Sequence, residues 1–394
     1  MRVDTTCNVI SWITLHVGCD PPRHRATCCN GLQQVAIERA SRSPYDTSDQ
    51  YASLRVFKWF LMSLSPVAHS FELLMALALV GLAITAISIY VSLPFLGRLA
   101  PALPNARSSH KTPVPQLGGV FVLAGALVAV SVFAPIGALS ITIACALALC
   151  VVGAIDDVQR LSISVRFICY MTVAGLFVFS QGDVSRLAPQ APYALEFAAV
   201  CLALFWFMNL TNFMDGIDGI VVAQFVPVFS FAALLGAFGL IGAAEGALGA
   251  ALAGALLGFF IFNKPRARIF LGDAGSVPLG FLGAVLCYWI ARDVNVLAAL
   301  APPLYFIADA SLTVCKRILQ RERFWLPHRK HFYQQAFDAG QSNWSIIARV
   351  VLSALALCAL AFAGLGEDSN TLLWLGTLAI LTVGSLLLSL ARRT

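Results

Sequence analysis

The sequence predicts an all-α, polytopic integral membrane protein with about eleven transmembrane helices. Of 394 residues, 59% are hydrophobic and 12% are charged, whereas roughly 25% are charged in a typical soluble domain. Apolar runs recur from Phe71 to Leu390, and most approach or exceed the roughly 20 residues that a helix needs to cross the hydrocarbon core. The runs do not alternate with polar residues as barrel strands would, so we expect helices.

The expected spans follow one another without a repeat, a heptad pattern or a low-complexity segment. Each is a stretch of predominantly apolar residues, and the shortest are the fourth and the eighth. The spans cover residues 71–93, 117–136, 138–154, 166–181, 194–214, 220–240, 243–262, 277–292, 296–314, 344–364 and 371–390.

Basic residues predict the orientation of these spans. They gather after the odd-numbered spans and in the C-terminal tail, whereas the even-numbered connections offer little beyond Arg186 and Arg292. Cytoplasmic loops carry the excess of Lys and Arg, so we place the odd-numbered loops and the C-terminus in the cytoplasm. The formal net charge of +6 then reflects topology and gives no indication of a nucleic-acid partner.

Residues 1–65 do not fit this pattern. Arg55 and Lys58 would lie on the outer side, against the charge rule, and the segment lacks the continuous apolar core of a signal peptide. We expect an over-extended reading frame whose true start is near Met62, with a genuine accessory tail as the alternative. The predicted organisation is a non-family tail, 1–65, followed by a transmembrane domain, 66–394.

Two groups of polar side chains lie where spans should end at the cytoplasmic face. Asp156 and Asp157 close the third span, and adjacent carboxylates repel each other unless a cation such as Mg²⁺ lies close. Interfacial solvation is the simpler alternative for this pair. The fifth span ends in polar residues spaced so that neighbours share a helix face, namely Asn209, Asn212, Asp215 and Asp218. An ordinary helix end needs fewer, so a ligand site is expected there.

Two further clusters lie in the loops after the seventh and ninth spans. Asp273 lies between glycines in a loop that re-enters the membrane at once, which suits Mg²⁺ because that ion takes one or two protein groups plus phosphate. His328, Arg329 and His331 offer a planar fork for phosphate and groups that exchange protons. Alone, this last group could be a basic surface loop. The predicted topology places all four clusters on one face, which favours one shared site.

At these motifs the sequence resembles the polyprenyl-phosphate N-acetylhexosamine-1-phosphate transferases, glycosyltransferase family 4, from about Phe71 to Arg393. The motifs run in order as Asp156-Asp157, Asn212-xx-Asp215-Gly-x-Asp218-Gly, Phe-Leu-Gly-Asp273-Ala-Gly-Ser and His328-Arg-x-His331. The segment Ser109-His110-Lys111-Thr-Pro-Val-Pro-Gln-Leu-Gly-Gly is similar to the family's first cytoplasmic loop.

The resemblance implies roles for individual residues. Asp273 and Asn212 would hold the metal. The carboxylates assigned to catalysis are Asp156, Asp157 and Asp215. The expected substrate-binding residues are Lys111, Arg166 on the diphosphate, Asp218 on the uracil ring, Asn263, and His328, Arg329 and His331 over the sugar and its phosphate. A phosphate monoester has a second pKa of about 6 and hardly needs a base, so Asp156 and Asp157 are interpreted first as positioning groups.

The reaction implied by the resemblance is attack by a lipid phosphate oxygen on the β-phosphorus of a UDP-sugar, releasing UMP. The peptidoglycan enzyme has consecutive histidines where this chain has His328-Arg-Lys-His331. That departure favours a UDP-GlcNAc or related donor, including a 6-deoxy form, and the branch that starts O-antigen (lipopolysaccharide) or other surface glycans. Phospho-N-acetylmuramoyl-pentapeptide transfer is the alternative within the family.

A transporter or lipid flippase is the alternative from another class, because buried carboxylates and kinking prolines also occur in carriers. A carrier needs polar groups near the midplane, whereas the clusters here are predicted at one face. The expected ligands are Mg²⁺, with Mn²⁺ as a substitute, a UDP-N-acetylhexosamine and undecaprenyl phosphate. We expect a multi-pass protein of the bacterial inner membrane with its site facing the cytoplasm, no nucleic acid, and leave a homodimer open.

Overall fold

The computed structural model describes residues 48–99, 101–102, 113–133, 136–182, 186–323, 326 and 328–391. The chain divides into two units, Met1–His69 and Ser70–Thr394. The first unit contributes only the beginning of helix α3 (Ser48–Leu99) to the described residues. Every predicted site residue belongs to the second unit, which is described from here on.

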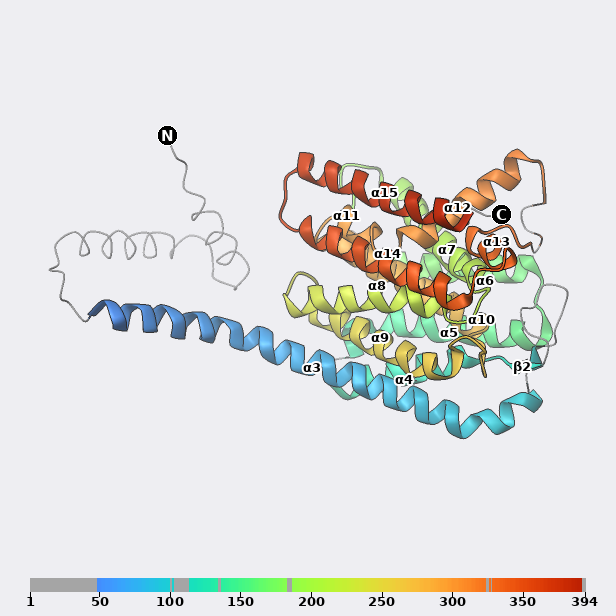
Figure 1. Ribbon diagram of the computed structural model, residues 1–394, viewed down its shortest axis with the longest axis horizontal. Helices are drawn as coiled ribbons and strands as arrows, with labels where there is room; N and C mark the ends of the chain where they lie inside the picture. Colours follow the sequence, from blue (N-terminus) through green and yellow to red (C-terminus); the bar gives the residue numbers. More distant parts are fainter. Residues whose placement is uncertain are drawn as a thin grey trace. The chain divides into compact units, whose positions relative to one another are not determined.

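Helices dominate this unit, as the composition predicts (Figure 1). Among the described residues, nine helices are long and apolar enough to cross a membrane. Their bounds are Ser70–Leu96 within α3, α5 Ser140–Gln159, α6 Ile163–Gln181, α7 Tyr193–Met214, α8 Ile220–Ala237, α9 Ala243–Asn263, α10 Asp273–Asp293, α14 Asn343–Ala363 and α15 Ser369–Ala391. The protein is therefore a multi-span membrane protein.

Shorter elements complete the unit. They are α4 Gly118–Phe133, the 3-10 helix η1 Ile136–Leu139, α11 Val296–Leu300, α12 Leu304–Leu319, α13 Phe332–Asp338, and the antiparallel strands β1 Pro101–Ala102 and β2 Val114–Pro115. The span predicted at 296–314 is two helices, because Pro302 and Pro303 interrupt it. Proline lacks an N–H and disfavours helix in the preceding residue. Gln224 of α8 donates from Nε2 to the Pro302 carbonyl at 2.9 Å, which satisfies an acceptor at the break.

Helix α10 lies at the centre and carries Asp273 at its first position. Of its most apolar window, 94% is buried, against 78% for α8 and α9 and 22% for α15. It packs against α4, α5, α7 and α8, and its glycines allow close approach of neighbouring backbones. Two of the predicted spans are shorter than the observed helices: α5 continues to Gln159, and α10 already begins at Asp273. The carboxylates of both motifs therefore lie within helical turns.

Candidate active site

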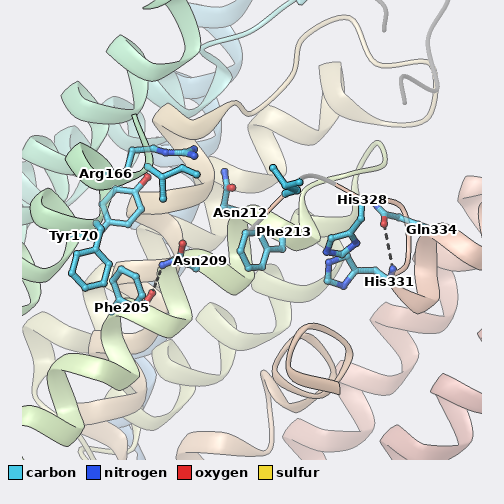
Figure 2. Close-up of a pocket in the computed structure, with 12 residues that line it drawn as sticks. Arg166, Tyr170, Phe205, Asn209, Asn212, Phe213, His328, His331 and Gln334 are labelled. Atoms are coloured by element: carbon cyan, nitrogen blue, oxygen red, sulfur yellow. Dashed lines mark hydrogen bonds between the residues drawn. The ribbon is translucent and has the colours of Figure 1, made fainter. Parts of the chain in front are cut away.

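A pocket of ≈ 290 Å³ lies between α6, α7 and the segment that precedes α13. Figure 2 shows Arg166, Asn209 and Asn212 toward one end and His328 and His331 toward the other, with Phe213 between them. We call the first end the helix wall, made by Arg166 and Asn212 with the carboxylates that they contact. The second is the loop wall, made by His328, His331 and Gln334. Two of the four sequence motifs thus line the pocket directly, through Asn212 and through His328 and His331.

The helix wall brings carboxylates from two helices onto one arginine. Nη1 of Arg166 lies 3.0 Å from Oδ2 of Asp156 and 3.6 Å from Oδ2 of Asp273. Asp156 also accepts a hydrogen bond from the backbone N–H of Leu161, so the last turn of α5 and the loop that follows hold it in place. Arg166 is about one third exposed, which leaves part of its guanidinium open to the pocket.

Asn212 lies beside Asp273 on the same wall, and the predicted role of the pair as metal ligands stays a prediction. Its Nδ2 donates to Oδ1 of Asp273 at 2.7 Å and to Oγ of Ser276 at 3.1 Å. The residues that meet here are 61 positions apart in the chain, and they meet because the end of α7 packs against the beginning of α10. An amide and a carboxylate side by side are a donor set that suits Mg²⁺, which needs few protein ligands.

Asp157 has a different task from its neighbour Asp156. Its Oδ1 and Oδ2 accept hydrogen bonds from the backbone N–H groups of Asp273 and Ala274, at 2.9 and 3.1 Å. The first N–H groups of a helix lack partners within it and favour a negative charge. A Cβ on Gly153 would lie 2.3 Å from the Asp273 carbonyl, so only glycine permits this approach. Asp157 therefore positions Asp273.

Asp218 and Asn263 tie two turns of the chain together. Oδ2 of Asp218 accepts from the backbone N–H groups of Arg266 and Ala267, at 3.0 and 3.2 Å. Asn263 accepts from the Gly219 N–H and donates to the Ile269 carbonyl, both at 2.9 Å. Both side chains are buried, and neither lines the pocket. Their predicted contacts with substrate stay predictions.

Asp215 ends α7 as a partly buried carboxylate. Among the described residues, no hydrogen bond or ion pair to this carboxylate is present, and the group lies near two others. Burial raises its pKa to about 7, and the charges of Asp157 and Asp218 add to that effect. A nearby cation would relieve the same repulsion.

The loop wall depends on Asp309, a residue that sequence analysis missed. This aspartate lies on α12, is fully buried, and contacts Nδ1 of His331 at 3.1 Å through Oδ1. The backbone N–H groups of Phe332 and Tyr333 also donate to it. The available signal was a carboxylate inside an apolar run, which in a membrane protein indicates a function or a partner.

Arg329 points toward Asp338. Its Nη2 and Nε lie 2.6 and 3.2 Å from the two carboxylate oxygens of Asp338, a bidentate pair at the surface. His328 does line the pocket, and its ring stacks on that of His331 with centroids 4.9 Å apart. Burial lowers the pKa of His328 to about 4, with help from the positive neighbours, so the ring is neutral at pH 7.

The two walls are joined through Tyr333. Its hydroxyl donates to the carbonyl of Phe213, two residues before Asp215, at 3.0 Å. A Cβ on Gly216 would lie 2.1 Å from the Tyr333 hydroxyl. Glycine at 216 is thus the condition for α13 to dock against the end of α7. Lys111, predicted to bind substrate, lies outside the described residues.

Comparison with known proteins agrees with this arrangement of site residues. A model of glycosyl transferase family 4 matches residues 139–291, which include Asp156, Asp157 and Asp273. A decaprenyl-phosphate N-acetylglucosaminephosphotransferase of Mycobacterium leprae is 26% identical over 324 residues, 70% of this chain and 80% of its own.

Two further relatives cover similar shares. A probable undecaprenyl-phosphate N-acetylglucosaminyl 1-phosphate transferase of Bacillus subtilis is 25% identical over 67% of this chain and 78% of its own. A phospho-N-acetylmuramoyl-pentapeptide-transferase of Symbiobacterium thermophilum is 29% identical over 62% of this chain and 81% of its own. With its four motifs in order, the chain is similar to glycosyl transferase family 4 and to the polyprenyl-phosphate sugar-1-phosphate transferases.

Proposed function

We propose that the protein transfers an N-acetylhexosamine-1-phosphate from a UDP-sugar to undecaprenyl phosphate and so starts a cell-surface glycan such as O-antigen. The donor is UDP-GlcNAc or a related UDP-N-acetylhexosamine, including a 6-deoxy form. The observation that carries the proposal is the helix wall, where Arg166, Asp156, Asp273 and Asn212 meet at one pocket. This wall combines a cation for phosphate oxygens with oxygen ligands for a metal.

Mg²⁺ is the metal that this donor set favours, and Mn²⁺ would substitute. When bound, the ion would neutralise charge on the diphosphate. Asp273 and Asn212 would hold it, because they lie side by side next to the pocket, and Asp273 shares Arg166 with Asp156. Arg166 would then bind phosphate oxygens with the part of its guanidinium that Asp156 leaves free.

The transfer step makes and breaks one phosphorus–oxygen bond. An oxygen of the lipid phosphate attacks the β-phosphorus of the UDP-sugar, and the bond to the UMP oxygen breaks, so that UMP leaves with the electron pair. The attacking phosphate has a second pKa of about 6 and is mostly deprotonated at pH 7. Asp156 orients Arg166 and Asp157 orients Asp273, which supports positioning as their first role. Catalysis then rests on placement and electrostatic stabilisation.

The pocket offers apolar surface beside its charged end. Ile163, Phe167 and Phe205 line it together with Tyr170, and Ile163 and Phe167 are half-exposed on the flank of α6. Such a surface suits the first isoprene units of a lipid whose phosphate reaches Arg166. The basic loops predict that this end of the helices faces the cytoplasm, where UDP-sugars are made.

A purified-enzyme assay tests the proposal. UMP release is measured with undecaprenyl phosphate and each of several donors, namely UDP-GlcNAc, UDP-GalNAc, a 6-deoxy UDP-N-acetylhexosamine and UDP-N-acetylmuramoyl-pentapeptide. We expect release with an N-acetylhexosamine donor, dependence on lipid phosphate, and loss with EDTA that Mg²⁺ restores. Release only with the muramoyl-pentapeptide donor would establish the peptidoglycan reaction instead. Movement of lipid across vesicles without any UMP would favour a flippase.

A further inference from the structure

Asp309 is a carboxylate side chain buried in the protein interior. It lies on helix α12 and is 0% exposed. Burying a charged group is unfavourable unless the group is paired and hydrogen-bonded. The groups that bond to Asp309 are side chains and backbone N–H groups that do not belong to the backbone of α12. Stabilising that helix therefore does not explain why a carboxylate is buried here.

Hydrogen-bond donors surround this carboxylate on every side. Oδ1 contacts Nδ1 of His331 at 3.1 Å, the Phe332 N–H at 3.1 Å and the Thr313 hydroxyl at 3.3 Å. Oδ2 contacts the Tyr305 hydroxyl at 3.2 Å and the Tyr333 N–H at 3.4 Å. With so many donors converging on two oxygens, the group acts as an acceptor only. The ring of His331 must therefore carry a proton on Nδ1.

This arrangement decides which atom of His331 meets a ligand. The Nδ1–H is held by Asp309, and the ring lies between those of His328 and Tyr333, with centroids 4.9 and 5.8 Å away. His331 nonetheless lines the pocket, as Figure 2 shows. The nitrogen left for a ligand is Nε2. Carboxylates that fix a histidine tautomer in this way are typical of sites where the other nitrogen acts.

We propose that Asp309 is a positioning residue for the transfer reaction, which fixes the ring of His331 so that Nε2 faces the donor's sugar or phosphate. The inference rests on the proposed function, and it adds a residue that touches no substrate. Its competitor is a purely structural role, in which Asp309 only caps the first N–H groups of α13.

A double-mutant cycle separates these two roles. Asp309→Asn keeps the shape and an oxygen for the backbone N–H groups, whereas His331→Asn keeps an N–H near Nδ1 and deletes Nε2. By analogy with other residues that orient a functional histidine, Asp309→Asn should lower kcat about 10- to 100-fold with a smaller change in KM. In a His331→Asn background, the same substitution should change kcat less than about twofold. An equal loss in both backgrounds would overturn the inference.

Controls keep the test decisive if Asp309→Asn folds poorly. Thr313→Val removes a donor from the same oxygen without touching the loop, and kcat should stay within about threefold of wild type because four other donors still hold the Asp309 carboxylate. His331→Asn should melt within a few degrees of wild type and lose most turnover. A His331→Asn enzyme that retains its turnover would show that Nε2 has no part in the reaction.

A spectroscopic measurement needs no substrate. In protein labelled with ¹⁵N-histidine, the Nδ1 and Nε2 shifts of His331, identified by their loss in His331→Asn, should show a proton on Nδ1. Asp309→Asn should remove that preference. A wild-type ring protonated on Nε2 alone overturns the inference. If no UDP-sugar supports UMP release, the proposed function fails, and this spectrum still reports on the Asp309–His331 pair.

Discussion

The helix wall and the loop wall enclose one pocket, yet they differ in how their charges are satisfied. On the helix wall, Asp156 and Asp273 share Arg166, and Asp157 lies beside Asp273, so negative charge is in excess. On the loop wall, His331 is paired with Asp309, and the neighbouring Arg329, which does not line the pocket, is paired with Asp338. The helix wall is therefore suited to take up a cation, whereas the loop wall is already neutralised by its own partners. Under the proposed function, the first would bind the diphosphate and the second would select the sugar beyond it.

The largest expected effect is on the helix wall. Asp273→Asn should lower turnover roughly 100- to 1000-fold, as expected when a group that stabilises the transferred charge is lost, because an amide is a weaker Mg²⁺ ligand than a carboxylate. Turnover is measured against Mg²⁺ concentration, with membrane abundance as the check on insertion. Ser276→Ala is the matched control, since it removes only the second partner of Asn212 and should remain active. Near-normal turnover of Asp273→Asn at limiting Mg²⁺ would refute the assignment.

The contact between the walls can be broken at Gly216. Gly216→Ala places a methyl group 2.1 Å from the Tyr333 hydroxyl, and such overpacking costs about 1–3 kcal/mol. We expect a lower melting temperature and a roughly tenfold loss of turnover, because α13 must move away from α7. Tyr333→Phe removes the clashing oxygen and should restore part of both. If the double variant is no better than Gly216→Ala, the walls do not meet through this contact.

Asp215 allows the excess of negative charge near the helix wall to be tested through the thermal stability of the protein. Burial raises its pKa to about 7 from an ordinary value of 3.8, so the folded protein binds a proton that the unfolded chain releases near pH 4. The stabilisation this gives is complete at acid pH and is lost as pH rises through 7. Asp215→Asn does not titrate, so its advantage in melting temperature should grow between pH 5 and pH 8 in EDTA. A difference that is constant with pH would contradict the excess of charge.

The contrast between the walls also explains what could be predicted from sequence. The helix wall was predictable because each of its groups lies at the end of an apolar run, and its partners all belong to short motifs. The partner of His331 was not, because Asp309 lies 22 positions away inside a helix and looks like an isolated charge. The break at Pro302 was missed for a related reason, since hydropathy over 296–314 does not register a missing N–H.

Substitutions at Arg329 test whether this residue leaves its partner in the protein to bind substrate. Arg329→Lys should lower turnover several-fold, because an ammonium cannot reproduce the bidentate fork. Asp338→Asn should change turnover by less than about twofold, since exposed ion pairs contribute only about 0–1 kcal/mol. Replacing residues 328–334 with those of a relative that uses another donor should shift the ranking of UDP-sugars. If that chimaera keeps both rate and ranking, the loop is only a basic surface segment.

The smallest effect is expected from the part of the chain that contributes to neither wall. A protein that starts at Met62 keeps Ser70–Thr394, the unit that contains every described residue of the pocket. The orientation predicted from the basic loops puts Arg55 and Lys58 on the outer side of the first span, where the charge rule disfavours basic residues. We therefore expect the same turnover per molecule and the same donor ranking as for the full chain. The comparison is made on membranes with equal amounts of each protein, and Asp273→Asn in the short form is the background control. A short form that inserts normally but has lost turnover would show that the N-terminal segment supports the pocket after all.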